Sequence, residues 1–353
     1  MRLRLFAASR FKEPTLELFY AIGAVIAGFV GLVWGADRFV DGASASARIA
    51  GVSPLVIGLT IVGFGTSAPE LLVSSIAAGT GSENLSVGNA LGSNVANVAL
   101  VLGVASLVAP LAVGKEVLYR EIPVLIAIMV LTGGLLFDGE LSRVDGILLL
   151  TGLVSLIGWI CFQGIRQHRA KVKERASLDP AQAEDFVDPA IDMSIGKALF
   201  LLFFGMIVLL AGAWGVVWGA TTIARSFGVS ELVIGLTVVA LGTSLPELAS
   251  TVISAMKGEH ELAIGNVVGS NMFNTLGVLG LPGVIAPGPL EEKVLYRDYP
   301  VVLGVTVGLF ILAWGFGAKE KKIGRARGAI LLLAYIGYVV WLVFDALKEA
   351  GTS

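Results

Sequence analysis

The segment GTSAPEL at residues 65–71 recurs as GTSLPEL at residues 242–248, 177 positions further along the chain. The same offset aligns three further pairs of segments without a gap: GVSPLVIGLT (51–60) with GVSELVIGLT (228–237), GNALGSN (88–94) with GNVVGSN (265–271), and KEVLYREIP (115–123) with EKVLYRDYP (292–300). Chance similarity between apolar helices does not keep one register over four segments. The chain therefore contains two related halves.

The composition is that of a membrane protein. Of the 353 residues, 56% are hydrophobic and 15% are charged, whereas an average soluble domain has about 25% charged residues. Apolar runs of about 20 residues, long enough to cross ~30 Å of hydrocarbon, recur along the chain and leave no room for a large soluble domain. We expect an all-α polytopic fold with ten transmembrane helices, near residues 17–40, 52–78, 85–110, 117–137, 145–165, 195–225, 229–256, 262–287, 294–316 and 323–345.

Five expected spans in each half are an odd number, so the second half enters the membrane from the opposite side. The sequence thus predicts two inverted five-helix repeats, residues 1–165 and 195–353, joined by a solvated linker at 166–194. Inverted repeats are typical of secondary transporters, which bind substrate at the midplane between the halves.

Basic residues predict how the chain lies in a plasma (inner) membrane. The linker and the loop at 319–327 each carry five Lys or Arg residues, and in a ten-helix chain both lie on one face. By the positive-inside rule that face is cytoplasmic, which places both termini outside, although basic residues near the N-terminus oppose this orientation.

Glu70 and Glu247 are the most unusual residues, because each lies in the middle of an apolar span. A charge there costs at least about 2.5–3.5 kcal/mol on insertion scales. Pro69 and Pro246, next to them, lack an N–H and free a backbone carbonyl one turn earlier. Hydroxyls follow the same repeat, at Thr66, Ser67, Thr243 and Ser244. These groups together form an all-oxygen pocket, which suits a hard cation such as Ca²⁺.

Further neutral oxygens come from the neighbouring spans. Ser93 and Asn97 are four residues apart, as are Ser270 and Asn274, so each pair lies on one helical face. Any single Ser, Thr or Asn can instead bond within its own helix or to a neighbouring helix, and for these residues both interpretations stay open. The two glutamates have no comparable structural explanation.

Three charged residues near the end of the first span break the symmetry of the halves. Asp37, Arg38 and Asp41 correspond to tryptophan, glycine and tryptophan in the second half. They can steer ions, but snorkelling of side chains at a helix end is the favoured interpretation.

Other partners and cofactors are not expected. A net charge of −2 gives no sign of nucleic-acid binding, and nothing in the sequence indicates an obligate protein partner. One cysteine and two distant histidines offer no cage for a softer metal. The expected partners are the lipid bilayer and transported ions.

The duplicated pattern GTSxPE followed by GNxxGSNxxN resembles the alpha-repeats of the calcium/cation antiporter superfamily, and is most similar to prokaryotic sodium/calcium exchangers. The resemblance covers essentially all ten expected spans. It implies that Glu70 and Glu247 bind Ca²⁺ and Na⁺ in turn, and that the first and sixth spans slide as gates. The implied ligands besides the glutamates are the backbone carbonyls of Thr66 and Thr243 for Ca²⁺, those of Gly63 and Ala240 for Na⁺, and Na⁺-site oxygens at Ser67, Ser244, Ser93, Ser270 and Asn97.

Asn274 departs from part of that family, in which some exchangers carry aspartate. The amide removes a possible third carboxylate and weakens any inference about stoichiometry or about potassium co-transport.

The expected function is therefore sodium/calcium exchange by alternating access, electrogenic if three Na⁺ exchange for one Ca²⁺. The nearest alternative is a proton/calcium antiporter, since carboxylates also exchange protons. A passive channel suits an inverted repeat with a closed acidic pocket less well. An intramembrane hydrolase would use the carboxylates as acid and base, but no His or Lys lies near either glutamate in the sequence, and an enzyme is not expected.

Overall fold

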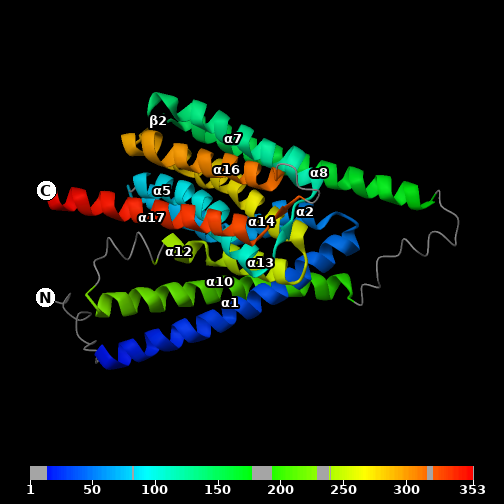
Figure 1. The fold of residues 1–353 in the computed structure, drawn as a ribbon, viewed down its shortest axis with the longest axis horizontal. Helices are drawn as coiled ribbons and strands as arrows, with labels where there is room; N and C mark the ends of the chain where they lie inside the picture. Colours follow the sequence, from blue (N-terminus) through cyan, green and yellow to red (C-terminus); the bar gives the residue numbers. More distant parts are fainter. Residues whose placement is uncertain are drawn as a thin grey trace, which may run out of the picture.

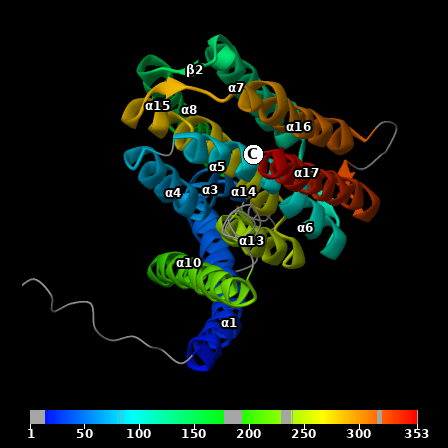
Figure 2. The same cartoon turned by 90° about the vertical axis from the view of Figure 1, so that its left-hand side faces the viewer.

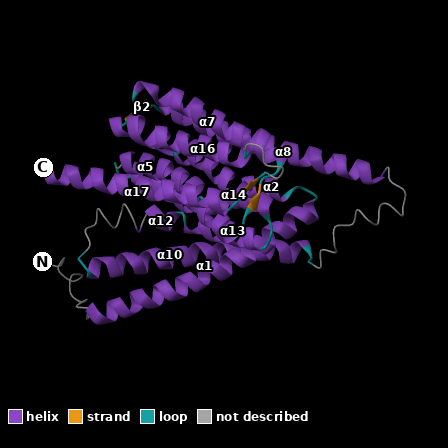
Figure 3. Ribbon diagram, in the orientation of Figure 1, coloured by secondary structure: helices purple, strands orange, loops and turns teal. Residues whose placement is uncertain are grey.

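The computed structural model describes residues 14–81, 83–176, 193–228, 238, 240–315 and 321–352, which are almost entirely helical (Figures 1 and 3). The α-helices are α1 (Pro14–Ala50), α2 (Pro54–Ile57), α3 (Gly63–Thr66), α4 (Ala68–Gly79), α5 (Glu83–Val95), α6 (Leu102–Val108), α7 (Ile122–Leu135), α8 (Arg143–Ala176), α10 (Ile195–Ser226), α12 (Ala240–Thr243), α13 (Leu245–Met256), α14 (His260–Phe273), α15 (Gly280–Ile285), α16 (Tyr299–Trp314) and α17 (Arg325–Thr352).

Wider π-helical turns interrupt several of these helices at matching places in the two halves. They are η1 (Gly58–Val62), η2 (Ala96–Val101), η3 (Val117–Glu121), η6 (Asn274–Val278) and η7 (Val294–Asp298), and η4 (Leu136–Asp138) is a short 3₁₀ turn. The strands are β1 (Leu111–Ala112), β2 (Glu140–Leu141), β3 (Gly288–Pro289) and β4 (Lys322–Ile323). Such π-turns occur frequently at functional sites.

The described residues contain eight helices long and apolar enough to cross a membrane, or nine if a bent pair counts as one span. The bent pair is Pro54–Thr66 with Ala68–Gly79, at 44°, and it falls where the span 52–78 is expected. The expected span 229–256 lies partly outside the described residues, and what is described of it includes the shorter apolar helix α13. The count of ten therefore stays a prediction.

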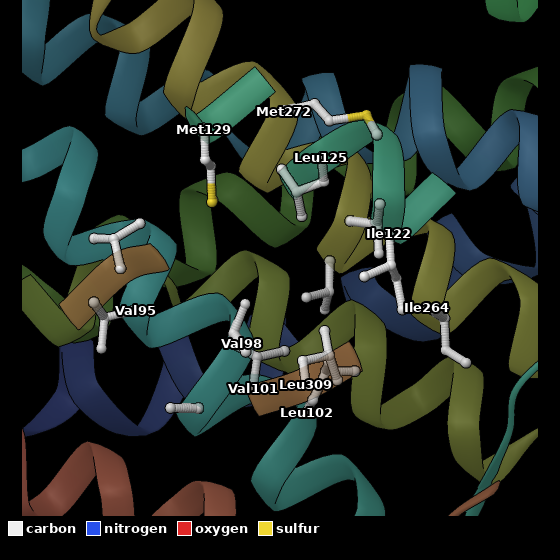
Figure 4. Close-up of a cluster of buried hydrophobic side chains, with 14 of the residues drawn as sticks. Val95, Val98, Val101, Leu102, Ile122, Leu125, Met129, Ile264, Met272 and Leu309 are labelled. Atoms are coloured by element: carbon white, nitrogen blue, oxygen red, sulfur yellow. The ribbon is translucent and has the colours of Figure 1, made fainter. Parts of the chain in front are cut away.

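Two of the long spans form the interior of the bundle. The most apolar window of Asn84–Val108 is 72% buried and that of His260–Ile285 is 100% buried, against 17–33% for the other six. Figure 4 shows the packing between them, where side chains such as Val98 and Leu102 lie with Met129 of α7 and Ile264 of α14. The helices that carry the candidate serines and asparagines are thus the most deeply buried ones.

Loops from the two halves meet at both ends of the bundle. At one end β1 pairs with β4, and His168 Nδ1 lies 3.2 Å from the Gly51 carbonyl; we call this end the linker face, because α8 ends there. At the other end β2 pairs with β3. Figure 1 shows that α1 begins and α17 ends at this second end, away from the end of α8.

Helices α1 and α10 form a closely packed antiparallel pair along one side of the bundle (Figure 2). A Cβ atom added to Gly28 would lie 2.8 Å from the Gly212 carbonyl oxygen, and one added to Gly35 would lie 2.5 Å from the Leu209 nitrogen. Small residues let backbones approach this closely in membranes, where packing replaces the hydrophobic effect as the driving force. Glycine at these positions therefore fixes the pair.

We predict that Gly212→Ala destabilises the α1–α10 pair. The new Cβ would lie 2.5 Å from the Leu32 nitrogen and 2.7 Å from the Gly28 oxygen, and backbone atoms cannot give way unless the helices separate. Overpacking of this kind costs about 1–3 kcal/mol, so the apparent melting temperature in detergent should fall. The control is Gly23→Ala, because no described atom lies within 4 Å of the Cβ position at Gly23. Equal melting temperatures for the two variants would contradict this account of the packing.

Candidate functional site

The expected breaks in the helices lie at the serine before each X-Pro-Glu sequence. Ser67 separates α3 from α4 with φ −81° and ψ 5°, and Ser244 separates α12 from α13 with φ −87° and ψ 3°. Proline occupies the first turn of both following helices, where its missing N–H costs nothing. Glu70 and Glu247 also lie in these first turns, where the positive end of the helix dipole stabilises a carboxylate.

The two glutamates lie in one closed site between the halves. Both side chains have 0% exposure, and each lies beside hydroxyl groups of the other half. Ser67 of the first half donates a hydrogen bond of 3.1 Å to Oε1 of Glu247 in the second half. The structure thus brings together two motifs that are 177 positions apart in the sequence.

Threonine and serine hydroxyls surround the carboxylates in a crossed pattern. Ser93 and Thr243 lie beside Glu70, while Thr66 and Ser270 lie beside Glu247. The threonine of each half is therefore next to the glutamate of the other half. Neither oxygen of the Glu70 carboxylate makes a hydrogen bond of standard geometry, which leaves both available to a bound cation.

Gly63 begins α3, and its carbonyl accepts a hydrogen bond of 3.3 Å from Ser270. The Ser270 hydroxyl also lies 3.3 Å from that of Thr66, so a carbonyl and two hydroxyls meet beside Glu247. Ala240 begins α12, the matching position of the second half, and nothing is described of its side chain.

Asn97 and Asn274, which the sequence assigns to the ion site, are buried amides without partners, as is Asn271. The side chains of Asn97 and Asn274 have 0% exposure, and neither the oxygen nor the nitrogen of either amide has a hydrogen-bond partner. The Ser244 hydroxyl is buried without a partner as well. An amide left unpaired in an apolar environment costs roughly 1–3 kcal/mol on the scale of protein mutations, so these groups favour a bound ion or water.

Two residues of the site were missed in the sequence. Asn89 donates hydrogen bonds to the Glu70 carbonyl at 3.1 Å and to Ser74 Oγ at 2.9 Å. Its counterpart Asn266 donates to the Glu247 carbonyl at 3.4 Å and to Ser250 Oγ at 2.8 Å. These amides hold the glutamate-bearing helices on the central ones. Their repetition in both copies of GNxxGSN is the signal that could have identified them.

The donor set is made of oxygen. Within the described part of the chain, no three His, Cys, Asp or Glu side chains come close enough to hold a metal ion together. Two carboxylates supplemented by hydroxyl, amide and carbonyl oxygens are the ligands that Ca²⁺ and other hard cations prefer. The arrangement can neutralise a charge of about +2 inside the membrane.

Comparison with known proteins gives matches along nearly the whole chain. The family described as sodium/calcium exchanger protein matches residues 20–162 and 197–344. The inner membrane protein YrbG of Escherichia coli K12 is 40% identical over 322 residues, covering 91% of this chain and 95% of YrbG. The sodium/calcium exchanger MaX1 of Methanosarcina acetivorans is 31% identical over 347 residues, covering 91% of this chain and 97% of MaX1.

A solved structure of the sodium-calcium exchanger NCX_Mj, soaked with Na⁺ and Ca²⁺, superimposes with a TM-score of 0.75 at 32% identity. It covers 91% of this chain and 97% of that chain. The similarity extends through both halves and is not confined to the repeated motifs.

We predict that Glu70→Gln and Glu247→Gln each remove the stabilisation that Ca²⁺ gives to the folded protein. Loss of one carboxylate should weaken Ca²⁺ binding by at least about tenfold, the factor that ~1.4 kcal/mol supplies. A ligand that binds only the folded state raises the melting temperature, so thermal unfolding with and without CaCl₂ measures the loss. The control is Glu116→Gln, a half-exposed carboxylate whose partner is Arg120. A Glu247→Gln protein that Ca²⁺ still stabilises fully would refute the site.

Proposed function

Because this chain belongs to the sodium/calcium exchanger protein family, we propose that it exchanges Na⁺ for Ca²⁺ by alternating access. It is an integral membrane protein of the calcium/cation antiporter superfamily, a group of transporters. Na⁺ as the counter-ion, the electrogenic cycle and the assignment of ligands are proposals. The observation that carries them is the pair of buried carboxylates from two halves in one oxygen-lined site.

Charge balance supports competition between the two ions. The carboxylates give the site a charge of −2, which one Ca²⁺ or two Na⁺ ions neutralise. Both ions need Glu70 and Glu247, so they bind in turn, and each half-cycle carries one kind of ion. If a third Na⁺ binds, each cycle moves one net charge, worth about 2.3 kcal/mol per 100 mV of membrane potential.

The neutral oxygens favour Na⁺ over H⁺ as the counter-ion. A proton would bind a carboxylate without help from other side chains. The buried amides of Asn97 and Asn274, together with Ser93 and Ser270, supply additional oxygen atoms, which a metal ion uses as ligands and a proton on a carboxylate does not need. We assign Thr66, Thr243, Gly63, Ala240, Ser67 and Ser244 to the same ion site, as the family resemblance implies.

We also propose that the chain is built of two inverted repeats, 1–165 and 195–353, of five spans each, joined by the linker 166–194. The antiparallel packing of α1 and α10 supports this, because the repeat makes them equivalent helices. The linker face would be cytoplasmic and both termini would lie outside. An inner (plasma) membrane location is supported by the name of the inner membrane protein YrbG.

Uptake of ⁴⁵Ca²⁺ into proteoliposomes tests the counter-ion. We predict uptake into Na⁺-loaded vesicles and none into K⁺-loaded vesicles. If three Na⁺ leave for each Ca²⁺ that enters, one net positive charge leaves the vesicle, so an inside-positive potential should stimulate uptake. Glu70→Gln and Glu247→Gln should abolish uptake. Uptake driven by a pH gradient without Na⁺ would replace this proposal with the proton/calcium antiporter.

Asn274→Asp tests the charge argument. A third carboxylate makes the empty site −3, so Ca²⁺ should bind at least about tenfold more tightly and leave more slowly, lowering the maximal rate of exchange. Apparent Ca²⁺ affinity and maximal rate come from the calcium dependence of Na⁺-driven uptake. The matched variant Asn274→Ala removes the amide without adding charge and should weaken the Na⁺ dependence instead. Identical Ca²⁺ affinity in the two variants would place Asn274 outside the ion site.

A further inference from the structure

The asymmetric charges of α1 form one stripe that faces another helix. Asp37, Asp41, Ser44 and Arg48 recur at intervals of four, three and four residues, which places them on one side of the helix. The sequence favoured snorkelling over ion steering for these charges, and the structure shows both aspartates in contact with a lysine. That lysine, Lys257, lies in the turn between α13 and α14.

Two sets of contacts join the stripe to this turn. Lys257 Nζ lies 2.7 Å from Asp37 Oδ1 and 2.6 Å from Asp41 Oδ1. Glu259 Oε1 accepts a hydrogen bond of 2.5 Å from the Ser44 hydroxyl and forms an ion pair with Arg48. All of these contacts involve the second half of α1, which ends at the linker face.

At the other face, the described residues Thr80 and Gly81 belong to the corresponding turn of the first half. Gly81 and Gly258 occupy equivalent positions with φ of 78° and 75°. The residues that correspond to Lys257 and Glu259 are Thr80 and Ser82, which are uncharged. Thr80 donates its hydroxyl back to the Ile76 carbonyl of its own helix. The sequence of this turn therefore lacks the two charges that Lys257 and Glu259 supply in the other half.

The contacts cross the boundary between two parts of the bundle. Helices α1 and α10 are packed on each other through glycines and lie to one side of the remaining helices (Figure 2). Helix α13 lies on the other side of the boundary, with Glu247 in its first turn and Lys257 directly after its last residue. Any movement that takes α1 away from α13 must therefore separate these ion pairs.

We propose that Asp37, Asp41, Ser44 and Arg48 with Lys257 and Glu259 form a one-sided ionic latch, which favours closure of the ion site toward the linker face. The proposal rests on the alternating access proposed above. The side chains in these ion pairs keep 17–43% of their surface exposed, so each pair is weak. The latch therefore biases the equilibrium between closed and open states and does not lock it.

Electron paramagnetic resonance distances across the boundary test the latch without any transported ion. Spin labels on Ala50→Cys and Met256→Cys, both at exposed positions, report the separation of α1 from α13 once the exposed Cys161 is replaced by serine. The samples are proteoliposomes in choline chloride with a chelator. Lys257→Met and Arg48→Glu should each increase the population at longer distance by roughly twofold to fivefold, the range that partly exposed ion pairs support.

A variant that swaps the two charges of one ion pair distinguishes an ionic contact from a general loss of packing. The double variant Arg48→Glu with Glu259→Arg should return the distances to those of the labelled parent. Lys293→Met is the matched control, because it removes a 2.7 Å ion pair with Asp345 that does not involve α1 or α13. Raising choline chloride to about 1 M screens exposed charges. In the labelled parent, which keeps all the ion pairs, this should also increase the population at longer distance. This arm of the test needs no substitution in the latch.

Unchanged distances in Lys257→Met and in high salt would overturn the latch, as would failure of the double variant to restore them. The result is independent of the proposed exchange. A protein whose distances shift as expected but which takes up no Ca²⁺ against Na⁺ would refute the exchange and leave the latch standing. Normal exchange of Na⁺ for Ca²⁺, together with spin-label distances that do not change, would refute only the latch.

Discussion

Two carboxyl groups with no exposed surface lie in one site inside this membrane protein, and the rest of the structure depends on the ways in which their charge is stabilised. Glu70 and Glu247 each lie in the first turn of a helix, so the amide dipoles of α4 and α13 point their positive ends at the site. The helix breaks that create these ends also expose backbone carbonyls and hydroxyls. A break that would be intolerable in contact with lipid is tolerated here because it lines a polar site.

Features that the two halves share build the site, whereas charges present in one half only lie at one end of the bundle. The repeat supplies each half with the same break, the same glutamate and the same asparagine that holds it, so two half-sites combine into one cage with crossed threonines. One difference between the halves lies at the ends of the bundle. Charges fill the α13–α14 turn and the facing stripe of α1, while the equivalent turn after α4 is uncharged. A symmetric site with asymmetric ends is what a transporter with a preferred resting side requires.

Packing explains how such a site can become accessible without unfolding. The central spans, Asn84–Val108 and His260–Ile285, are buried on most sides, whereas α1 and α10 contact each other through glycine and leave the remaining helices on one side. Phe39 of α1 shares one buried cluster with Val62 and Leu262 of the remaining helices, so movement of the α1–α10 pair must repack this boundary. Ligands at the core can then stay in place while the covering helices change position, as population shifts between discrete packings allow.

The sequence by itself determined the membrane class, the two related halves, the break before each X-Pro-Glu sequence and the two glutamates, because hydropathy, repeat register and proline chemistry are all local properties. It also marked Ser93, Asn97, Ser270 and Asn274, although a bond within their own helix was an equal alternative for each. Only the tertiary structure decided that Ser67 reaches Glu247, that Asn89 and Asn266 hold the glutamate backbones, and that Asp37 and Asp41 contact Lys257. These contacts join residues 19 to 220 positions apart, and which side chains meet over such separations depends on how the helices pack, which no local pattern specifies.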